Sequence, residues 1–147
     1  MVISVGVTGA SGFIGSAILE NFSKERNFRT TKIIRNNGSF AVRDHFDIIV
    51  HCAEISDRKV VNDMGDQYKA KALDSIEYLI SKCDYFIYLS SSLLYNPGTS
   101  NRKNENSKVN LTDNYCQIKS NAEKLVIQSE GVALRLSSVY GDKMSKG

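Results

Sequence analysis

Three of the ten glycines in this chain fall in the short stretch VTGASGFIG, at Gly9, Gly12 and Gly15. The stretch follows the apolar run MVISVGVT and precedes an amphipathic segment with apolar residues at helical spacing. Glycine adopts turns that other residues avoid, and it lets another group approach the backbone closely. The segment therefore needs either a tight turn for packing or room for a large anion against the backbone.

A glycine pattern of this spacing between a strand and a helix is typical of dinucleotide binding. The first glycine permits the sharp turn, the second admits a pyrophosphate, and the third lets the helix pack close to the strand. The N–H groups and the positive end of the helix then face the phosphates. A glycine-rich helix start with no ligand is the alternative interpretation of the same residues.

The rest of the chain alternates strand-like and helix-like segments, which predicts an α/β fold with a parallel sheet and helices on both faces. Together with the glycine turn, this alternation predicts a Rossmann-like, doubly wound parallel sheet in three αβα layers. The expected strands are 1–8, 30–36, 46–53, 84–92 and 131–141, and the expected helices are 16–23, 66–81 and 115–129.

Length and composition indicate one globular domain over residues 1–147, with no internal boundary. The net charge of +3 is scattered, which argues against nucleic-acid binding. No apolar run approaches the ~18 residues needed to cross a membrane, and no signal peptide is apparent. Three spaced cysteines and two histidines predict no metal site and a reducing, cytoplasmic location.

The segment YCQIK places Tyr115 and Lys119 one turn apart on a predicted helix. An ammonium group near a phenol lowers the pKa of the phenol, which then exchanges a proton near neutral pH. The preceding strand ends in SSSLLY, and ligands bind at the carboxyl ends of parallel strands. By itself the Tyr/Lys spacing is common, and it usually means two solvated side chains.

Five segments occur in one order: TGASGFIG, DIIVHCAE, YLSSSLLYN, YCQIKSNAEKLV and LRLSSVYG. In this order the chain resembles, over essentially its whole length, the extended short-chain dehydrogenases/reductases. These are NAD(P)-dependent nucleotide-sugar epimerases, dehydratases and reductases. The resemblance implies hydride transfer from a sugar carbon to the nicotinamide while Tyr115 takes the hydroxyl proton. Lys119 would lower the pKa of Tyr115 and hold the nicotinamide ribose.

The same resemblance implies the remaining site residues. In the family the catalytic hydroxyl lies four residues before a tyrosine that corresponds to Tyr95. The resemblance therefore implies Ser91, with Ser92 as the alternative, whereas Ser90 is expected to point into the sheet. The cofactor-binding residues expected are Gly9, Ser11, Gly12, Phe13, Ile14, Gly15, Arg35, Ala53, Tyr115 and Lys119.

The implied substrate is a nucleotide-activated sugar, as in bacterial surface polysaccharide synthesis. An NADPH-dependent reductase of a small carbonyl compound and a dinucleotide-binding module without catalysis are the alternatives. The segment IIRNN offers Arg35 and no acidic residue at the end of the second strand, which favours NADP over NAD.

The chain departs from the family pattern in three places. Residues 36–47 are too few for the usual strand and helix, which predicts a reduced sheet edge and a shallower adenine site. The asparagine of the family's site corresponds to Asn62, followed by Gly65, or in another alignment to the slot of Lys71. Family members also continue beyond VYGD into a substrate domain. The chain is therefore a piece of a longer protein, which its catalytic residues favour, or a truncated relative without activity.

Four further expectations concern less specific features. The helices near 66–81 and 115–129 pair in family dimers, so a homodimer through them is expected, with Tyr78, Leu125 and Ile127 as outward candidates that equally suit the core. The polar segment 96–114 is a lid over the substrate or a surface loop. His51 is expected to line the core or the cofactor, and Cys116 to serve packing.

Overall fold

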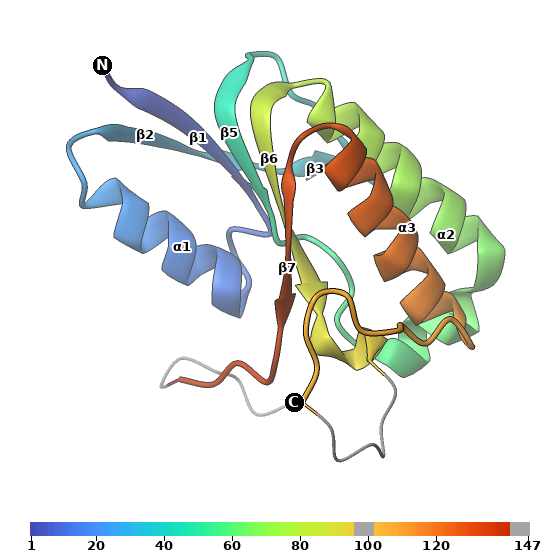
Figure 1. Cartoon of the computed structure of the whole chain (residues 1–147). Coiled ribbons are helices and arrows are strands. Elements are labelled where there is room, and N and C mark those ends of the chain that lie inside the picture. The colour runs from blue at the N-terminus through green and yellow to red at the C-terminus, as the bar shows by residue number, and fades with distance from the viewer. Residues whose placement is uncertain (96–101, 142–147) are drawn as a thin grey trace.

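A five-stranded sheet forms the centre of the computed structural model, which describes residues 1–95 and 102–141 (Figure 1). Its strand order is β2-β1-β5-β6-β7, and every neighbouring pair is parallel. The strands are β1 (Ile3–Thr8), β2 (Phe28–Ile33), β5 (Phe46–His51), β6 (Cys83–Ser91) and β7 (Val132–Leu136). The helices are α1 (Phe13–Ser23), α2 (Arg58–Ile80) and α3 (Asn114–Gln128), with a 3-10 turn η1 (Ser92–Leu94) after β6.

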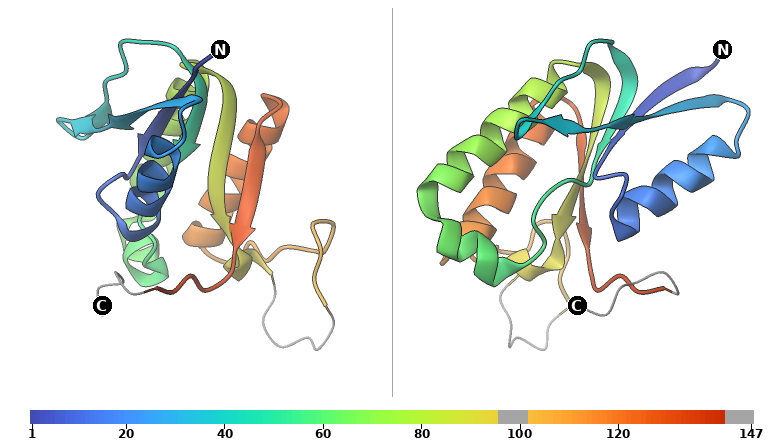
Figure 2. Two further views of the ribbon diagram at one scale, coloured as in Figure 1. Left: turned by 90° about the vertical axis from the view of Figure 1, so that its left-hand side faces the viewer. Right: turned by 180° about the vertical axis from the view of Figure 1, so that it is seen from behind.

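The helices form two outer layers around the sheet. Helix α1 packs on β1 and β2, whereas α2 and α3 lie side by side on the opposite face (Figures 1 and 2). Alternating residues of each strand fill the two interfaces, as the pleat of a strand requires. Val5 and Val7 pack with residues of α1, and Ile49 and Phe86 pack with residues of α2 and α3. The three-layer α/β fold predicted from the sequence is confirmed.

The register of the strands brings three carboxyl ends together. Thr8 at the end of β1 lies opposite His51 at the end of β5, and His51 lies opposite Tyr88 on β6. The segments that follow these strands therefore leave the sheet from one edge, which is where α/β proteins bind their ligands.

A small hairpin occupies the place of the missing strand and helix. The strands β3 (Arg35–Asn36) and β4 (Ser39–Phe40) pair antiparallel around Asn37 and Gly38, whose φ angles are 50° and 80°. Two positive φ angles in an Asn-Gly pair are typical of a tight hairpin turn. The prediction of a strand over 30–36 is wrong at its end, because Arg35 begins this hairpin. Among the described residues no strand lies outside β2, so the expected reduction of the sheet edge is confirmed.

Other boundaries also differ from the expected ones, most of all those of α2 and β7. Helix α2 starts before residue 66 because the side chain of Asp57 caps it, accepting bonds from the N–H groups of Lys59 and Val60 at 2.9 and 3.1 Å. Gly65, with φ 68° and ψ −159°, interrupts this helix. The last strand ends at Leu136, so the prediction of a strand to residue 141 is too long.

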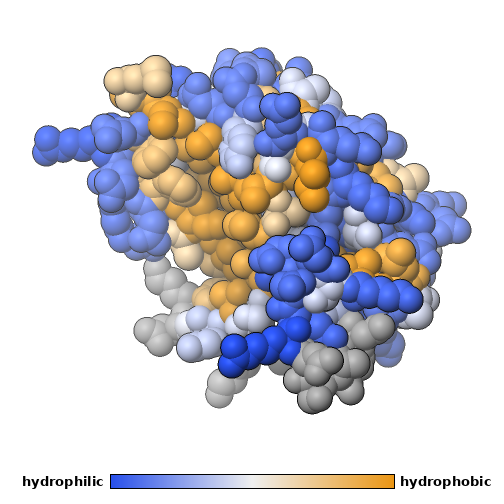
Figure 3. Space-filling view, in the orientation of Figure 1, coloured by the Kyte–Doolittle hydropathy of each residue, from blue (hydrophilic) through white to orange (hydrophobic). Residues whose placement is uncertain are grey.

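One face of the sheet is only partly covered. Within the described ranges α1 is the sole helix on its side, and it packs on β1 and β2 rather than on β6 and β7. Tyr85 on β6 and Leu134 on β7 are each 43% exposed, and Figure 3 shows apolar residues gathered beside α1. Within the same ranges no helix combines the length and apolarity that crossing a membrane requires.

Candidate functional site

The carboxyl ends of β1, β5 and β6 open into a cavity of about 570 Å³. It brings the glycine turn of the N-terminal segment next to Tyr115 and Lys119, which come from the far end of the sequence. Its lining includes Gly9, Gly12, Phe13, Ile14, Gly15, His51, Glu54, Ser91, Tyr115 and Lys119. The catalytic residues predicted from the sequence therefore share one cavity with most of the predicted cofactor residues.

Packing requires two of the three glycines, and the third is less closely surrounded. A Cβ on Gly9, whose φ is +64°, would lie 2.8 Å from the carbonyl of Cys52. A Cβ on Gly15 would lie 2.2 Å from the oxygen of Gly9. A Cβ on Gly12 would approach nothing closer than that oxygen, at 3.3 Å. A side chain at Gly12 would therefore strain the backbone less than one at Gly9 or Gly15, and it would enter the cavity that Gly12 lines.

The start of α1 is suited to an anion. No side chain caps this helix, so the N–H groups of its first turn face outward without a helical partner. Such groups, at the positive end of the helix dipole, bind phosphate. Gly12 and Phe13, at this start, both line the cavity. The cradle therefore fits the pyrophosphate of a dinucleotide.

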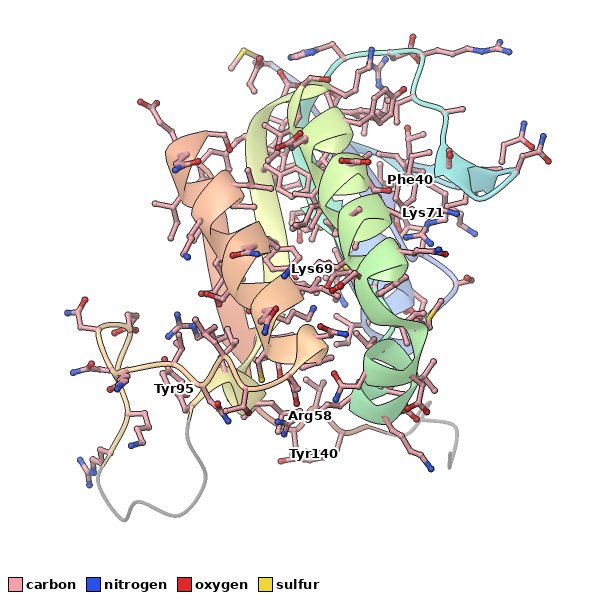
Figure 4. The ribbon with its side chains drawn as sticks, turned by 90° about the vertical axis from the view of Figure 1, so that its right-hand side faces the viewer. Phe40, Arg58, Lys69, Lys71, Tyr95 and Tyr140 are labelled. Atoms are coloured by element: carbon pink, nitrogen blue, oxygen red, sulfur yellow. The ribbon has the colours of Figure 1, made fainter. Side chains whose placement is uncertain are left out.

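Three residues fix the start of α3 and thereby the position of Tyr115. Asp113 caps the helix, with Oδ1 accepting from the N–H of Cys116 at 2.9 Å, and its other oxygen accepts from Arg58 Nε at 2.6 Å. Asn62 Oδ1 accepts from the backbone N–H of Tyr115 at 2.9 Å. Figure 4 shows Arg58 where α2 and α3 begin.

The position of Asn62 distinguishes it from the alternative, Lys71. Asn62 contacts α3 directly, whereas the Nζ of Lys71 lies 3.0 Å from where a Cβ on Gly38 would be, beside the hairpin (Figure 4). Asn62 thus contacts Tyr115 itself, whereas Lys71 lies near the hairpin. Sequence reasoning did not identify Arg58 or Asp113, although an Asp just before an expected helix is a capping signal.

The side chain of Lys119 is buried, and its ammonium group bonds to acceptors near the ends of two strands. Its ammonium donates to Glu54 Oε2 and, at 3.1 Å, to the carbonyl oxygen of Leu89. It lies 4.9 Å from the ring centre of Tyr88 and 5.9 Å from that of Tyr115. The ammonium and the Tyr115 phenol are thus neighbours, as the Tyr/Lys spacing predicted.

Glu54 is a site residue that sequence reasoning missed. Burial would raise the pKa of this carboxyl, but the charge of Lys119 and the bonds from Lys119 and Tyr88 hold it below its usual value. The hydroxyl of Tyr88 donates to Glu54 Oε2 at 2.7 Å, and burial together with this carboxylate raises the pKa of Tyr88 well above its ordinary value. The signal was present in DIIVHCAE, which places an acid three residues after a buried strand.

The three serines at the end of β6 have different surroundings. Ser91 lines the cavity, and its Oγ accepts a bond from the N–H of Leu93 at 3.2 Å. Ser90 also borders the cavity but is buried, and its hydroxyl donates to Glu123 Oε1 at 2.6 Å. Ser92 begins η1 and is not part of the lining. The geometry favours Ser91, and its catalytic role stays a prediction.

A second cavity, of about 300 Å³, adjoins the first at Gly9. It contains the three predicted cofactor residues that the larger cavity lacks, namely Ser11, Arg35 and Ala53. The guanidinium of Arg35 donates to the carbonyl oxygen of Ala53 at 3.1 Å and lies 4.7 Å above the ring centre of Phe40. Two adjoining cavities that meet at the phosphate cradle suit the two halves of a dinucleotide.

His51 and Cys116 serve packing near the site. His51 Nδ1 lies 2.9 Å from the hydroxyl of Thr8, and burial lowers the pKa of the imidazole to about 4, so the ring is neutral. Burial raises the pKa of the Cys116 thiol to about 11, which leaves it protonated and unreactive. In the described segments no group of three or more potential ligands among His, Cys, Asp and Glu is placed to hold a metal.

The outward candidates for a dimer interface differ in their contacts. The Tyr78 hydroxyl lies between the N–H and the carbonyl of Val42, at 3.1 and 3.3 Å, so this residue packs within its own chain. Ile127 is 64% exposed, and Leu125 is half-buried. Lys69 joins α2 to Gln117 of α3 at 2.9 Å (Figure 4). Dimerisation through these helices stays a prediction.

The fold is similar to that of several solved structures. A UDP-N-acetylglucosamine 4-epimerase from Methanobrevibacter ruminantium, solved with UDP-N-acetylmuramic acid, is 19% identical, with a TM-score of 0.76 over 91% of this chain and 54% of its own. A UDP-glucuronic acid 4-epimerase from Bacillus cereus, solved with NAD, is 20% identical, with a TM-score of 0.75 over 95% and 57%. RMD from Pseudomonas aeruginosa, solved with NADPH, is 17% identical, with a TM-score of 0.77 over 93% and 53%.

The chain thus spans a little over half the length of these structural relatives. No curated protein sequence matches it. The family model described as "NAD dependent epimerase/dehydratase family" matches residues 5–147, which is nearly the whole chain and includes both the glycine turn and the Tyr115/Lys119 helix. The chain belongs to the NAD-dependent epimerase/dehydratase family.

Proposed function

We propose that this chain binds NADP or NAD across its two adjoining cavities and, as the cofactor half of an enzyme, supports hydride transfer on a nucleotide-activated sugar. The observation that carries the proposal is the single cavity in which the glycine turn meets Ser91, Tyr115 and Lys119. Structural relatives were solved with NAD, with NADPH and with UDP-sugars, which supports the same ligand classes here. Because the chain spans only part of their length, the sugar site is inferred from the family.

Each residue of the cavity has its own role in the proposed reaction. The first-turn N–H groups of α1 hold the pyrophosphate, and Lys119 holds the ribose next to the nicotinamide. The nicotinamide ring, when bound, would accept the hydride from the sugar carbon. Tyr115 acts as the acid/base: it takes up the proton that the sugar hydroxyl loses on oxidation and returns the proton when the carbonyl is reduced. The hydroxyl of Ser91 bonds the same sugar oxygen and orients it.

Arg35 favours NADP over NAD. Its guanidinium lies in the smaller cavity, beside the end of β2 where the adenine ribose binds in this fold. Its contacts in the described residues, the Ala53 carbonyl and the Phe40 ring, leave the positive charge without a carboxylate partner. A ribose 2′-phosphate would supply the missing negative charge.

Calorimetric titration with NADPH and then NADH tests the proposal. The variant is Gly12→Val, because a side chain at this position enters the cradle and its Cβ would meet only the Gly9 oxygen, at 3.3 Å, whereas a Cβ on Gly9 or Gly15 would lie within 2.8 Å of backbone atoms. The matched control is Ala70→Val, which adds the same side chain at an exposed position of α2. We expect micromolar binding to wild type and Ala70→Val, and at least about tenfold weaker binding to Gly12→Val.

Arg35→Ala separates the two cofactors. It should weaken NADPH binding about tenfold or more, the loss of one charge-assisted contact, and leave NADH binding nearly unchanged. If wild type binds neither cofactor, dinucleotide binding by this chain is refuted. If Gly12→Val binds as wild type does, the glycine turn serves packing and not phosphate.

A further inference from the structure

One carboxylate oxygen in the wall of the larger cavity has no hydrogen-bond donor. Glu54 Oε2 accepts from Lys119 and from Tyr88, whereas Oε1 is the one buried side-chain oxygen or nitrogen in the described residues without a partner. The Glu54 side chain is only 10% exposed, and it belongs to the cavity lining. A buried acceptor without a donor is costly and needs an explanation.

Lys119 has complementary capacity. Its ammonium carries three N–H donors, and in the described residues two of them are used, by Glu54 and by the Leu89 carbonyl. Oε1 of Glu54 thus lacks a donor, and one N–H of the Lys119 ammonium lacks an acceptor in the described residues, and the two groups are in direct contact. A ligand that offers a hydroxyl hydrogen and a hydroxyl oxygen on neighbouring atoms would satisfy both.

We propose that Glu54 is a ligand-binding residue, whose Oε1 accepts a hydrogen bond from the vicinal diol of the ribose on the nicotinamide side of a bound dinucleotide. The diol donates one hydroxyl hydrogen to Glu54 and accepts the remaining N–H of Lys119. This inference rests on the proposed function, because it takes a dinucleotide as the ligand.

Charge supports a hydroxyl ligand and excludes a phosphate at this end of the cavity. A phosphate has no hydrogen to give to Oε1 and would be repelled by the Glu54 carboxylate, whereas the uncapped start of α1 attracts phosphate. The lining of the cavity therefore includes a group that favours phosphate, at Gly12, and a group that favours a diol, at Glu54. A dinucleotide carries both groups.

ADP and ADP-ribose test this assignment by calorimetric titration, because they differ by the second ribose. The variant Glu54→Gln keeps the size of the side chain and an acceptor for Lys119 and Tyr88. The control is Glu77→Gln, which removes an exposed carboxylate from α2. We expect Glu54→Gln to weaken ADP-ribose binding about tenfold while ADP binding changes less than about twofold, and Glu77→Gln to change neither.

A second variant protects the test against loss of folding. The double substitution Glu54→Ala with Lys119→Met leaves no buried charge unpaired, and its ADP-ribose affinity should fall to that of ADP. Urea unfolding confirms that each variant is folded. If folded Glu54→Gln binds ADP-ribose as tightly as wild type, or more tightly, Glu54 is only the counter-ion of Lys119 and the assignment is overturned. If wild type binds neither ADP nor ADP-ribose, the proposed function fails, and this assignment fails with it.

Discussion

The backbone N–H of Tyr115 donates to the side-chain oxygen of Asn62 at 2.9 Å, so the broken helix α2 fixes the residue predicted to act as acid/base. Asn62→Ala removes this acceptor and leaves the N–H of Tyr115 without a partner. We expect the free energy of unfolding to fall by about 1–2 kcal/mol, as for loss of a helix cap. Urea unfolding with an unchanged slope measures it. The control is Asp63→Ala, at the exposed neighbouring position, which should change the free energy of unfolding little. Equal losses of stability in Asn62→Ala and Asp63→Ala would contradict the structural role of Asn62.

The buried pair of Glu123 and Arg135 should contribute far more than a surface pair. Glu123 accepts two bonds from the Arg135 guanidinium, at 2.9 and 2.7 Å, and its side chain is 8% exposed. Glu123→Ala leaves the guanidinium without its carboxylate partner and the Ser90 hydroxyl without its acceptor, which should cost about 3 kcal/mol.

The exposed pair of Lys24 and Glu20 supplies the comparison. Its N and O atoms lie 3.0 Å apart, but both side chains are largely exposed, so Lys24→Met should cost less than about 1 kcal/mol. Denaturant unfolding of the two variants gives the comparison directly. Similar losses for Lys24→Met and Glu123→Ala would show that burial does not decide the strength of these pairs.

His51 should make the protein less stable in acid before the carboxylates do. Burial lowers its pKa to about 4 in the folded state, whereas the unfolded chain has the ordinary value of about 6.5. Below pH 6.5 the unfolded state therefore binds a proton that the folded state does not, and stability falls as the pH drops from 6.5 toward 4. The loss is about 2–3 kcal/mol across this window.

Unfolding free energies at pH 7 and pH 5 measure this effect. In His51→Asn the decrease between the two pH values should largely disappear, whatever the variant costs at pH 7. The control is His45→Gln, which removes the only other histidine, an exposed one, and should leave the decrease in place. A decrease in His51→Asn as large as in wild type would assign the acid sensitivity to other groups.

Substitutions at two glycines of the turn should separate folding from binding. A Cβ on Gly15 would lie 2.2 Å from the backbone oxygen of Gly9, so Gly15→Ala should cost about 3 kcal/mol or more. Gly12→Ala meets the same oxygen at 3.3 Å and should cost less than about 1 kcal/mol. Thermal unfolding ranks the two variants, and a Gly12→Ala protein as unstable as Gly15→Ala would contradict the geometry.

Local sequence was sufficient for most of the fold. Buried strands gave continuous apolar runs, and the short segment after Asn36 left no room for a further strand and helix, so the sheet edge was predicted correctly. The hairpin was missed although Asn37-Gly38 is a strong turn signal, because the segment was compared only with the family's usual strand and helix. The early start of α2 was missed although Asp57 is a capping residue and Val61, Met64 and Tyr68 follow it at helical spacing.

The candidate site, like the fold, was predicted in part from the sequence. The glycines, Ser91, Tyr115 and Lys119 were placed together because the carboxyl ends of parallel strands share one edge. The bonds of Glu54 with Lys119 and of Asn62 with Tyr115 join residues 65 and 53 positions apart, and no local pattern encodes such pairs. The roles assigned to these residues stay predictions until the binding experiments are made.

The hairpin that replaces the usual strand leaves β2 as the rim of the sheet, with unpaired backbone groups along its outer side in the described part of the chain. Such a rim is a template on which a strand from another molecule can assemble. Exposed Arg29 and Lys32 lie on β2, and their charges oppose stacking against a second copy of the same strand. Because the short connection leaves β2 at the edge, the charges of Arg29 and Lys32 oppose self-association of the protein through the sheet.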